Sequence, residues 1–276
     1  MKLPVVVLCV VAFAGCASFG TFAGQEGEVS YADSAEANMK KGDDAMEAKN
    51  YAEAASYFEF VKTKYPYLEL AKTAELRLGD ADFERERYLE ARDRYQNFVR
   101  LHPTHPKVDY AAFRAALTHY KEIPSDFFLL PPAAEKDQVE VRNALAAMND
   151  FLRTYPQSEH VPAAKKAADE VKLRMAEHEL YVADFYSNPL RARWPAVAAR
   201  LEVVAKNYSG IGLDERVAFG LHDAYLKMNQ PAKARAALER YAKAFPDAPA
   251  AKKALGLAEK LPTVDPAPAG APDAGS

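Results

Sequence analysis

The amino-acid sequence predicts an all-α fold, a solenoid of about five helix–turn–helix repeats closed by a C-terminal capping helix. Residues 50–66 (NYAEAASYFEFVKTKYP) carry apolar side chains at helical i, i+3, i+4, i+7 spacing and stop at Pro66, which has no N–H to continue a helix. The same plan recurs at residues 87–103, 141–156, 193–209 and 230–246. A helix of about 14 residues is marginal alone in water, so the repeated apolar stripes must be buried against neighbouring helices.

The composition bounds the class of protein and its partners. Hydrophobic residues make up 49% of the 276 residues and charged residues 27%, which fits a globular or solenoid protein with a substantial core. The formal net charge is −3, without a basic bias, so nucleic acid is not expected as a partner.

The N-terminus is expected to be a targeting segment. Residues 1–15 combine Lys2 with an apolar run that is too short to span a bilayer, and they read as a lipoprotein signal peptide. Small residues directly before Cys16 resemble the bacterial lipobox, in which the cysteine is lipidated and begins the mature chain; the alternative is an ordinary secretory signal. Residues 16–32 lack periodicity and are expected to form a lipid-anchored flexible tether. Ala17 after the cysteine resembles a signal for transfer to the outer membrane, facing the periplasm.

Residues 33–106 are expected to hold the first two repeats, which resemble the 34-residue tetratricopeptide repeat (TPR). If Pro66 takes position 32 of that repeat, small residues fall at positions 8 and 20, where the two helices approach each other, and an aromatic residue falls at position 24 between them. These residues are Gly42, Ala54 and Phe58 in the first repeat and Gly79, Ala91 and Tyr95 in the second.

Residues 107–261 are expected to hold repeats three to five and the capping helix. The repeats end at residues 66, 103, 156, 209 and 246, so the two middle intervals are longer than the others. In the third repeat the extra length is an insert at 121–138 with an apolar run, 127–130 (FFLL), which either forms a contact patch or folds back onto the solenoid. In the fourth repeat it is expected to lengthen the first helix, 162–186. A last helix at 248–261 would cover the open end, and the Pro/Ala-rich residues 262–276 are expected to be disordered.

No catalytic constellation stands out, so an enzyme is not expected. The sequence has no HExxH pair, nucleophile elbow, P-loop or dinucleotide fingerprint. His102 and His105 share one turn, where a metal site competes with the more ordinary interpretation of a repeat-ending loop. We therefore expect no metal and no cofactor.

The architecture instead offers a binding surface. In TPR proteins the stacked first helices line a concave groove, which suits an extended peptide with aromatic anchors. The alternative is that half of the groove positions belong to the core between repeats. The candidate groove residues are Met39, Asp43, Met46, Leu76, Asp80, Phe83, Phe113, Leu117 and Tyr120.

Over residues 30–246 the chain resembles the BamD family of outer-membrane protein assembly lipoproteins. The lipobox, the tether, the five repeats and the run 174–186 (RMAEHELYVADFY), which leads into WPAVAARLEVVAKNYS, carry the resemblance. Residues 188–189 (Asn-Pro), the insert and the Pro-rich tail depart from the family pattern.

The resemblance implies a non-enzymatic role in inserting β-barrel proteins into the outer membrane. The N-terminal repeats would bind C-terminal segments of unfolded outer-membrane proteins. The C-terminal repeats would dock on a POTRA domain of the BamA-like barrel subunit through Arg200, which is otherwise an ordinary exposed arginine, and accessory lipoproteins are further possible partners. The alternative function is another periplasmic TPR lipoprotein adaptor, such as a secretin pilotin or a cell-division coordinator.

Overall fold

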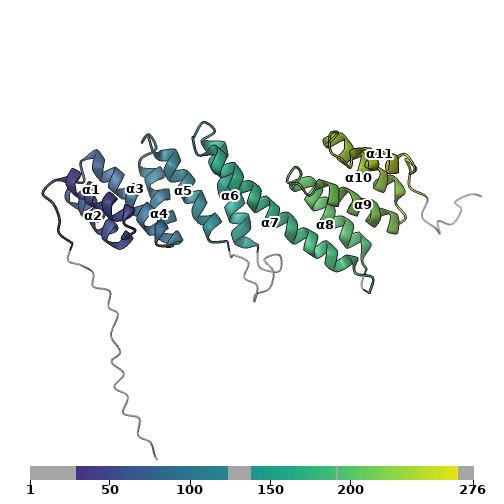
Figure 1. Cartoon of the computed structure of the whole chain (residues 1–276), viewed down its shortest axis with the longest axis horizontal. Coiled ribbons are helices and arrows are strands. Elements are labelled where there is room, and N and C mark those ends of the chain that lie inside the picture. The colour runs from purple at the N-terminus through teal and green to yellow at the C-terminus, as the bar shows by residue number, and fades with distance from the viewer. Residues whose placement is uncertain (1–28, 124–137, 191, 267–276) are drawn as a thin grey trace, which may run out of the picture.

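The computed structural model describes residues 29–123, 138–190 and 192–266, and within these ranges it contains eleven α-helices and no strand (Figure 1). Five helix pairs and a last single helix follow one another, which confirms the predicted TPR solenoid with its capping helix. The helices are α1 (Ala35–Glu47), α2 (Tyr51–Lys64), α3 (Glu69–Glu84), α4 (Tyr88–Leu101), α5 (Val108–Lys121), α6 (Val139–Thr154), α7 (Val161–Ser187), α8 (Trp194–Asn207), α9 (Asp214–Lys227), α10 (Pro231–Ala244) and α11 (Ala251–Ala258).

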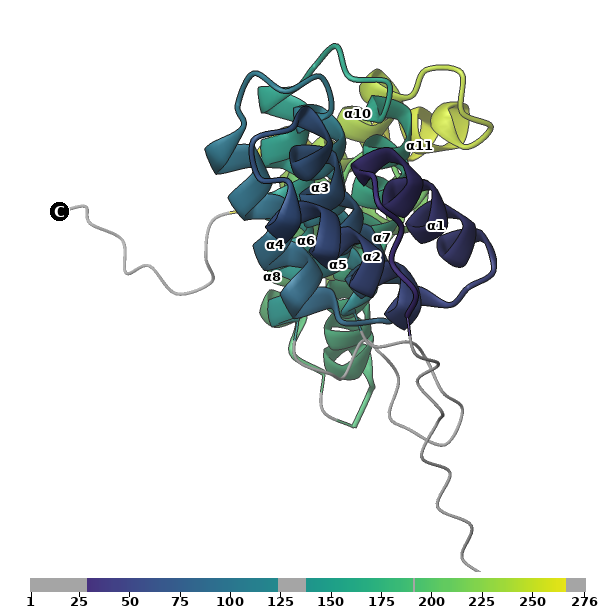
Figure 2. The same cartoon turned by 90° about the vertical axis from the view of Figure 1, so that its left-hand side faces the viewer.

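The helices stack in chain order, and each packs against the next. Figure 1 shows an elongated molecule in which α7 is the longest helix and connects the N-terminal repeats with the C-terminal ones. Figure 2 looks at the same molecule from its N-terminal end, where α1 and α2 lie nearest the viewer. The core is a series of apolar clusters, each shared by neighbouring helices, as expected for a solenoid without one central core.

Glycine lets the two helices of each N-terminal repeat approach closely. A Cβ atom on Gly42 would lie 2.4 Å from Cε1 of Phe58, and one on Gly79 would lie 2.8 Å from Cε1 of Tyr95. Both aromatic side chains have no exposed surface. The pairing of positions 8 and 24 expected from the sequence is therefore present in both repeats.

The second helices of all five repeats end in the same way. Their C-cap residues have φ between −125° and −132° and ψ between 31° and 64°, outside the helical region. Proline follows four of them, and it disfavours the helical conformation of the residue before it. The C-cap residues are Tyr65, His102, Tyr155, Tyr208 and Phe245.

The middle repeats contain the extra length. Helix α7 has 27 residues and accounts for the extension expected in the fourth repeat. Most of the insert expected at 121–138, including the FFLL run, lies outside the described residues, as do Cys16 and the signal peptide. Helix α11 has 8 residues and is shorter than the expected 248–261. Among the described helices, none combines the length and the apolar character needed to cross a membrane.

The chain before α1 is held against the first repeat. The buried Asn38 side chain accepts a hydrogen bond from the Ala32 backbone N–H at 2.9 Å and donates to the Ala32 carbonyl oxygen at 2.8 Å. The Tyr31 ring stacks on Phe60 with 4.2 Å between ring centroids. These contacts hold the last two residues of the segment that the sequence assigns to a tether.

Candidate functional site

An open groove runs across the first helices of the first three repeats. Three residues of α1 form one wall, α3 forms the floor, and the start of α5 with the turn before α7 forms the other wall. Its volume is about 620 Å³, and it is open to solvent. The lining residues are Met39, Asp43, Glu47, Thr73, Leu76, Arg77, Asp80, Pro106, Lys107, Asp109, Tyr110, Glu159 and His160.

Four of the nine candidate groove residues line this groove, namely Met39, Asp43, Leu76 and Asp80. They differ in how much surface they offer. Leu76 is 2% exposed and Asp80 is 4% exposed, so both lie deep in the floor, whereas nearly half of the Asp43 side chain is open to solvent. Met39 also belongs to the apolar cluster of the first repeat.

The other five candidates lie in the packing between helices. Met46 contacts the cluster of the first repeat, and Phe83 is buried in that of the second. Phe113 is buried against α6 and α7, while Leu117 and Tyr120 are partly buried in the same region. These side chains contribute to the packing between helices and do not line the groove.

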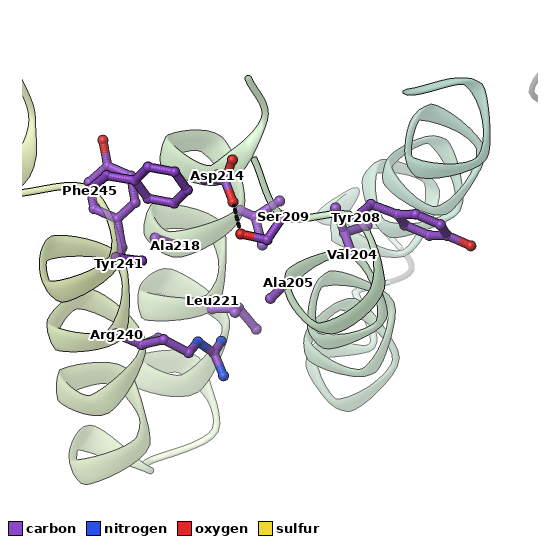
Figure 3. A pocket seen from close by; sticks show the side chains of 13 residues that line it. Val204, Ala205, Tyr208, Ser209, Asp214, Ala218, Leu221, Arg240, Tyr241 and Phe245 are labelled. Atoms are coloured by element: carbon purple, nitrogen blue, oxygen red, sulfur yellow. Dashed lines mark hydrogen bonds between the residues drawn. The ribbon is translucent and has the colours of Figure 1, made fainter. Parts of the chain in front are cut away.

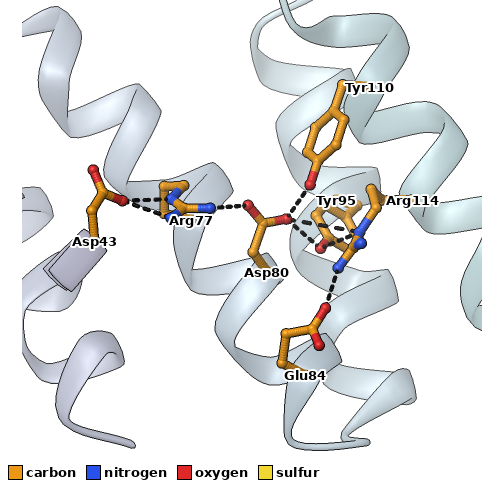
Figure 4. Close-up of polar contacts among 7 residues, drawn as sticks. All are labelled: Asp43, Arg77, Asp80, Glu84, Tyr95, Tyr110 and Arg114. Carbon is orange, nitrogen blue, oxygen red and sulfur yellow. Dashed lines mark hydrogen bonds and ion pairs between the residues drawn. The ribbon is translucent and has the colours of Figure 1, made fainter. Parts of the chain in front are cut away.

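Asp80 is the centre of a buried polar network that joins three repeats (Figure 4). Its Oδ1 atom accepts hydrogen bonds from the hydroxyls of Tyr95 at 2.7 Å and Tyr110 at 2.8 Å. Its Oδ2 atom accepts from Arg77 Nη1 at 3.0 Å, and Arg114 lies 3.8 Å from Oδ1 as a second cation. A buried carboxylate is costly unless it is paired and hydrogen-bonded, and here both oxygens are satisfied.

The network extends to the surface at both ends. On the α1 side, Asp43 Oδ1 accepts hydrogen bonds from Arg77 Nε at 2.9 Å and Nη2 at 2.6 Å. On the other side, Arg114 Nη2 donates to Glu84 at 3.2 Å, and its guanidinium lies 3.8 Å from the centre of the Phe83 ring. Charges of alternating sign thus link α1, α3 and α5, which sets the spacing of the helices that line the groove.

The two tyrosines of the network are held as neutral donors. Burial, and then the charge of Asp80, raise the pKa of both Tyr95 and Tyr110 far above the ordinary value for tyrosine. Asp80 therefore keeps its partners at any physiological pH, and its role in the groove is structural support.

The groove also contains residues that the repeat pattern did not single out, above all Arg77, Lys107, Tyr110 and His160. Arg77 lies three residues before Asp80, which occupies the repeat position of Asp43, so it is about one helical turn from that equivalent position, and this spacing was a usable signal for the ion pair. The His160 ring stacks on Phe113 at 5.1 Å, but it comes from the turn before α7, which no repeat position marks.

Arg200, the candidate docking residue, lies on α8 with 45% of its side chain exposed. Its Nη1 atom donates to Glu179 of α7 at 3.0 Å. Arg216 of α9 makes a similar exposed pair with Asp184 of α7 at 2.7 Å. This surface therefore presents arginines that are partly neutralised by α7.

A second cavity is lined by residues of α8, α9 and α10 (Figure 3). Tyr241 and Phe245 contribute aromatic surface, and Ser209 donates a hydrogen bond to Asp214 at 2.6 Å beside it. The Tyr208 ring points away from the cavity, and its hydroxyl lies 3.9 Å from Sδ of Met175 on α7 (Figure 3). The volume of the cavity is about 50 Å³, roughly that of one or two water molecules at about 30 Å³ each. It is too small for a peptide or a cofactor.

Two groups of residues that include histidine are relevant to whether the chain has a metal site, which the sequence does not lead us to expect. His102 lies 3.1 Å from Glu75, and both His102 and His105 pack edge-on against Phe98 in the repeat-ending turn. Separately, the possible ligand atoms of His119, Glu122 and Glu140 lie within 4.8 Å of one another.

An arginine already provides positive charge at the second group. Arg92 Nη1 donates to Glu122 at 2.6 Å and to His119 Nδ1 at 3.0 Å. Burial, and then the charge of Arg92, lower the pKa of His119. The guanidinium thus already binds two of the three residues that could hold a metal ion.

Comparison with known proteins identifies the family. The family model described as YfiO, outer membrane lipoprotein, matches residues 32–215, which is most of the helical body. The chain belongs to this family. A second model, a tetratricopeptide repeat, matches residues 220–260.

Relatives named outer membrane protein assembly factor BamD confirm the resemblance seen in the sequence. The protein of Caulobacter vibrioides is 27% identical over 202 residues, which cover 72% of this chain and 63% of that protein. The protein of Neisseria gonorrhoeae is 27% identical over 234 residues, which cover 83% of this chain and 86% of that protein. Among solved structures, the TPR2AB domain of yeast Sti1 in complex with pHSP90 aligns with 82% of this chain and 83% of that chain at 14% identity and a TM-score of 0.43.

Proposed function

We propose that this chain is a non-enzymatic lipoprotein scaffold of the β-barrel assembly machinery in the outer membrane. The N-terminal groove binds extended C-terminal segments of unfolded outer-membrane proteins. The C-terminal repeats dock on a POTRA domain of the barrel subunit, and acylated Cys16 holds the chain to the outer membrane on its periplasmic side. Membership of the YfiO family and the names of the BamD relatives support this role.

The groove is the observation that carries the proposal. It is open to solvent and lined by residues from the first helices of three consecutive repeats, so it suits an extended chain better than a compact ligand. Leu76 in the floor and Met39 in the α1 wall are almost completely buried and contribute only a little apolar surface, and Tyr110 adds an aromatic side chain. Ionised side chains along the rim would provide polar contacts to the peptide backbone.

A matched pair of substitutions tests the groove. Thr73 lines the groove on α3, whereas Thr63 lines the opposite side of the repeats on α2. We expect a labelled peptide with the sequence of a β-barrel C-terminus, ending in an aromatic residue, to bind the chain in fluorescence anisotropy. Thr73→Trp should fill the groove and abolish binding, and Thr63→Trp should leave it unchanged. Equal binding by both variants would place the peptide elsewhere.

The anchor is tested by Cys16→Ser. Without a thiol no acyl chain can be attached, so the variant should move from the membrane fraction to the soluble periplasmic fraction. Retention in the membrane at the wild-type level would contradict a lipid anchor on Cys16.

Affinity purification from solubilised membranes separates this proposal from the other adaptor functions. We expect a POTRA-bearing barrel protein to be recovered with the chain. Recovery of a secretin without such a barrel protein would instead indicate a pilotin.

A further inference from the structure

A second hollow lies between α2 and α4, on the other side of α3 from the groove. Leu78 and Asp82, in its floor, follow Leu76 and Asp80 of the groove by two positions, which is about 200° around a helix. The hollow has a volume of about 620 Å³. The two binding surfaces are therefore back to back and share α3 as a wall.

Three arginines, Arg85, Arg87 and Arg94, line this hollow around one buried carboxylate, that of Asp82. Asp82 is 5% exposed. Arg94 Nε donates to it at 2.7 Å, whereas Arg85 Nη1 lies 3.9 Å away, beyond hydrogen-bond distance.

Within the described ranges, most of the guanidinium donors in the hollow make no hydrogen bond. Arg87 makes no polar side-chain contact within the part of the chain that the structure describes. Each guanidinium has five N–H donors in a fork that suits a carboxylate, and among these three only Arg94 Nε is engaged. Arg77 in the groove differs, because its Nε, Nη1 and Nη2 atoms all bond to aspartates.

The hollow is positively charged as a result. Asp82 neutralises at most one of the three arginines. Glu59 also lines the hollow, but Lys62 pairs with it at 2.7 Å. Glu86 and Glu90 are close in sequence to the arginines but do not line the hollow.

An aromatic surface borders the arginines. Tyr31 stacks on Phe60, and 45% of Tyr31 remains exposed at the rim. Such a ring can take an apolar or aromatic side chain of a partner. The positive charge and the apolar surface together suit a peptide that carries acidic side chains and an apolar side chain. A flat membrane surface would not enter a hollow between two helices.

We propose that this hollow binds an acidic extended segment of a partner protein. Carboxylates of the segment bond to Arg85, Arg87 and the terminal nitrogens of Arg94, and one apolar or aromatic side chain packs on Tyr31. This site is independent of the peptide groove, so the chain can hold a substrate and a second partner at once.

The test uses the chain without its leader and with Cys16→Ser, so that no lipid interferes. The probe is a short labelled peptide of glutamates around one tryptophan, and its control has lysine in place of glutamate. Anisotropy should show that the acidic probe binds, that added salt weakens binding and that the lysine probe does not bind. Arg85→Gln with Arg87→Gln should weaken binding by at least about tenfold, because bonds between charged groups are lost. Arg94 is kept because it neutralises the buried Asp82.

The matched control is Arg153→Gln, which removes an exposed arginine of α6 and should leave the affinity unchanged. The double variant should also bind the groove peptide as before. Three results would overturn the proposal. The double variant could bind the acidic probe normally. Vesicles containing phosphatidylglycerol could bind through Arg85 and Arg87 while the peptide does not. The acidic probe could also bind only after Glu26→Gln and Glu28→Gln are introduced. That result would mean that the chain's own N-terminal segment is the occupant of the hollow.

Discussion

Gly42 and Gly79 set the distance between the two helices of the first two repeats. Each faces a fully buried aromatic ring at a distance that leaves no room for a methyl group. Glycine costs helix stability relative to alanine, by about 1 kcal/mol. At these positions the cost is offset by the packing of Phe58 and Tyr95.

Alanine at Gly42 should therefore destabilise the chain despite its better helix propensity. Overpacking costs about 1–3 kcal/mol, which exceeds the propensity gain of about 1 kcal/mol. Gly256 of α11 is the matched control, because no atom lies within 4 Å of a Cβ built there. Urea unfolding should show a lower midpoint for Gly42→Ala and an equal or higher one for Gly256→Ala. A stabilised Gly42→Ala chain would mean that the two helices can move apart freely.

Tyr225 should make the stability of the chain sensitive to alkaline pH. Burial, the charge of Glu202 and a 3.0 Å hydrogen bond to it raise the pKa of Tyr225 to about 12. The unfolded chain releases this proton near pH 10, about two units earlier, so stability is lost as pH rises from about 10 to 12. Thermal unfolding of Tyr225→Phe should show a smaller loss over this range than the wild type. Tyr67→Phe, at a ring that is 99% exposed, should change nothing; an equal effect of both substitutions would contradict the assignment.

Single residues also mark the limit of what the sequence predicts. Repeat numbering placed Asp43 and Asp80 at the same position of consecutive repeats, and both do line the groove. Only Asp80 is buried, because Tyr95 and Tyr110, which lie 15 and 30 residues further on, bring hydroxyl donors to it. Helical periodicity predicts which face of its helix a residue occupies. It does not predict which hydrogen-bond donors from other helices lie beside that residue in the fold.

At the scale of elements, the spacing of apolar residues and the prolines at helix ends predicted most of the helix bounds. Helix α6 spans residues 139–154, within two residues of each end of the predicted stretch 141–156, and α10 begins at Pro231, which suits the first turn of a helix. The turns between the paired helices were not predicted. Lys49, Glu86 and Asn229 have φ between 56° and 61°, a left-handed conformation that non-glycine residues rarely adopt. Lysine and glutamate at two of these positions give no signal for it, whereas asparagine is enriched in this conformation, so Asn229 was a usable signal.

Helix α2 should affect the groove only through packing. Phe58 has no exposed surface and shares a cluster with Met39, so Phe58→Ala should cost about 3–5 kcal/mol of stability. Groove-peptide affinity should fall with it, and Phe58→Leu should restore much of both. Phe60→Ala, on the opposite face of α2, should leave groove binding intact. If Phe58→Ala lost the peptide at unchanged stability in urea, the residue would have to contact the peptide directly.

At the scale of the whole molecule, the N-terminal and C-terminal repeats present different surfaces. The groove and the arginine hollow both lie within the first repeats, whereas the exposed arginines of α8 and α9 lie beyond α7 (Figure 1). Stacked repeats contact mainly their neighbours, so a substitution in one half should leave the other folded. This separation makes substrate binding and docking testable one at a time.

Docking on the barrel subunit, as proposed, should depend on Arg200. Its guanidinium is half exposed and makes one bond to Glu179, so it retains donors for an acidic group of the POTRA domain. Arg200→Glu should abolish co-purification of the barrel protein, because it reverses the charge and adds repulsion. Groove-peptide affinity should stay unchanged, since α8 is not part of the groove.

Two further variants separate docking from the internal ion pair. Glu179→Gln removes the partner of Arg200 while keeping the cation, so it should preserve docking or strengthen it. Arg153→Glu reverses a charge that is 79% exposed on α6 and should have no effect. The Arg153–Asp150 pair is exposed on both sides and contributes at most about 1 kcal/mol, so Arg153→Glu should unfold near the wild-type urea midpoint. If Glu179→Gln lost the barrel protein as fully as Arg200→Glu, the ion pair itself would be required, and Arg200 would act by holding α8 against α7 instead of contacting the partner.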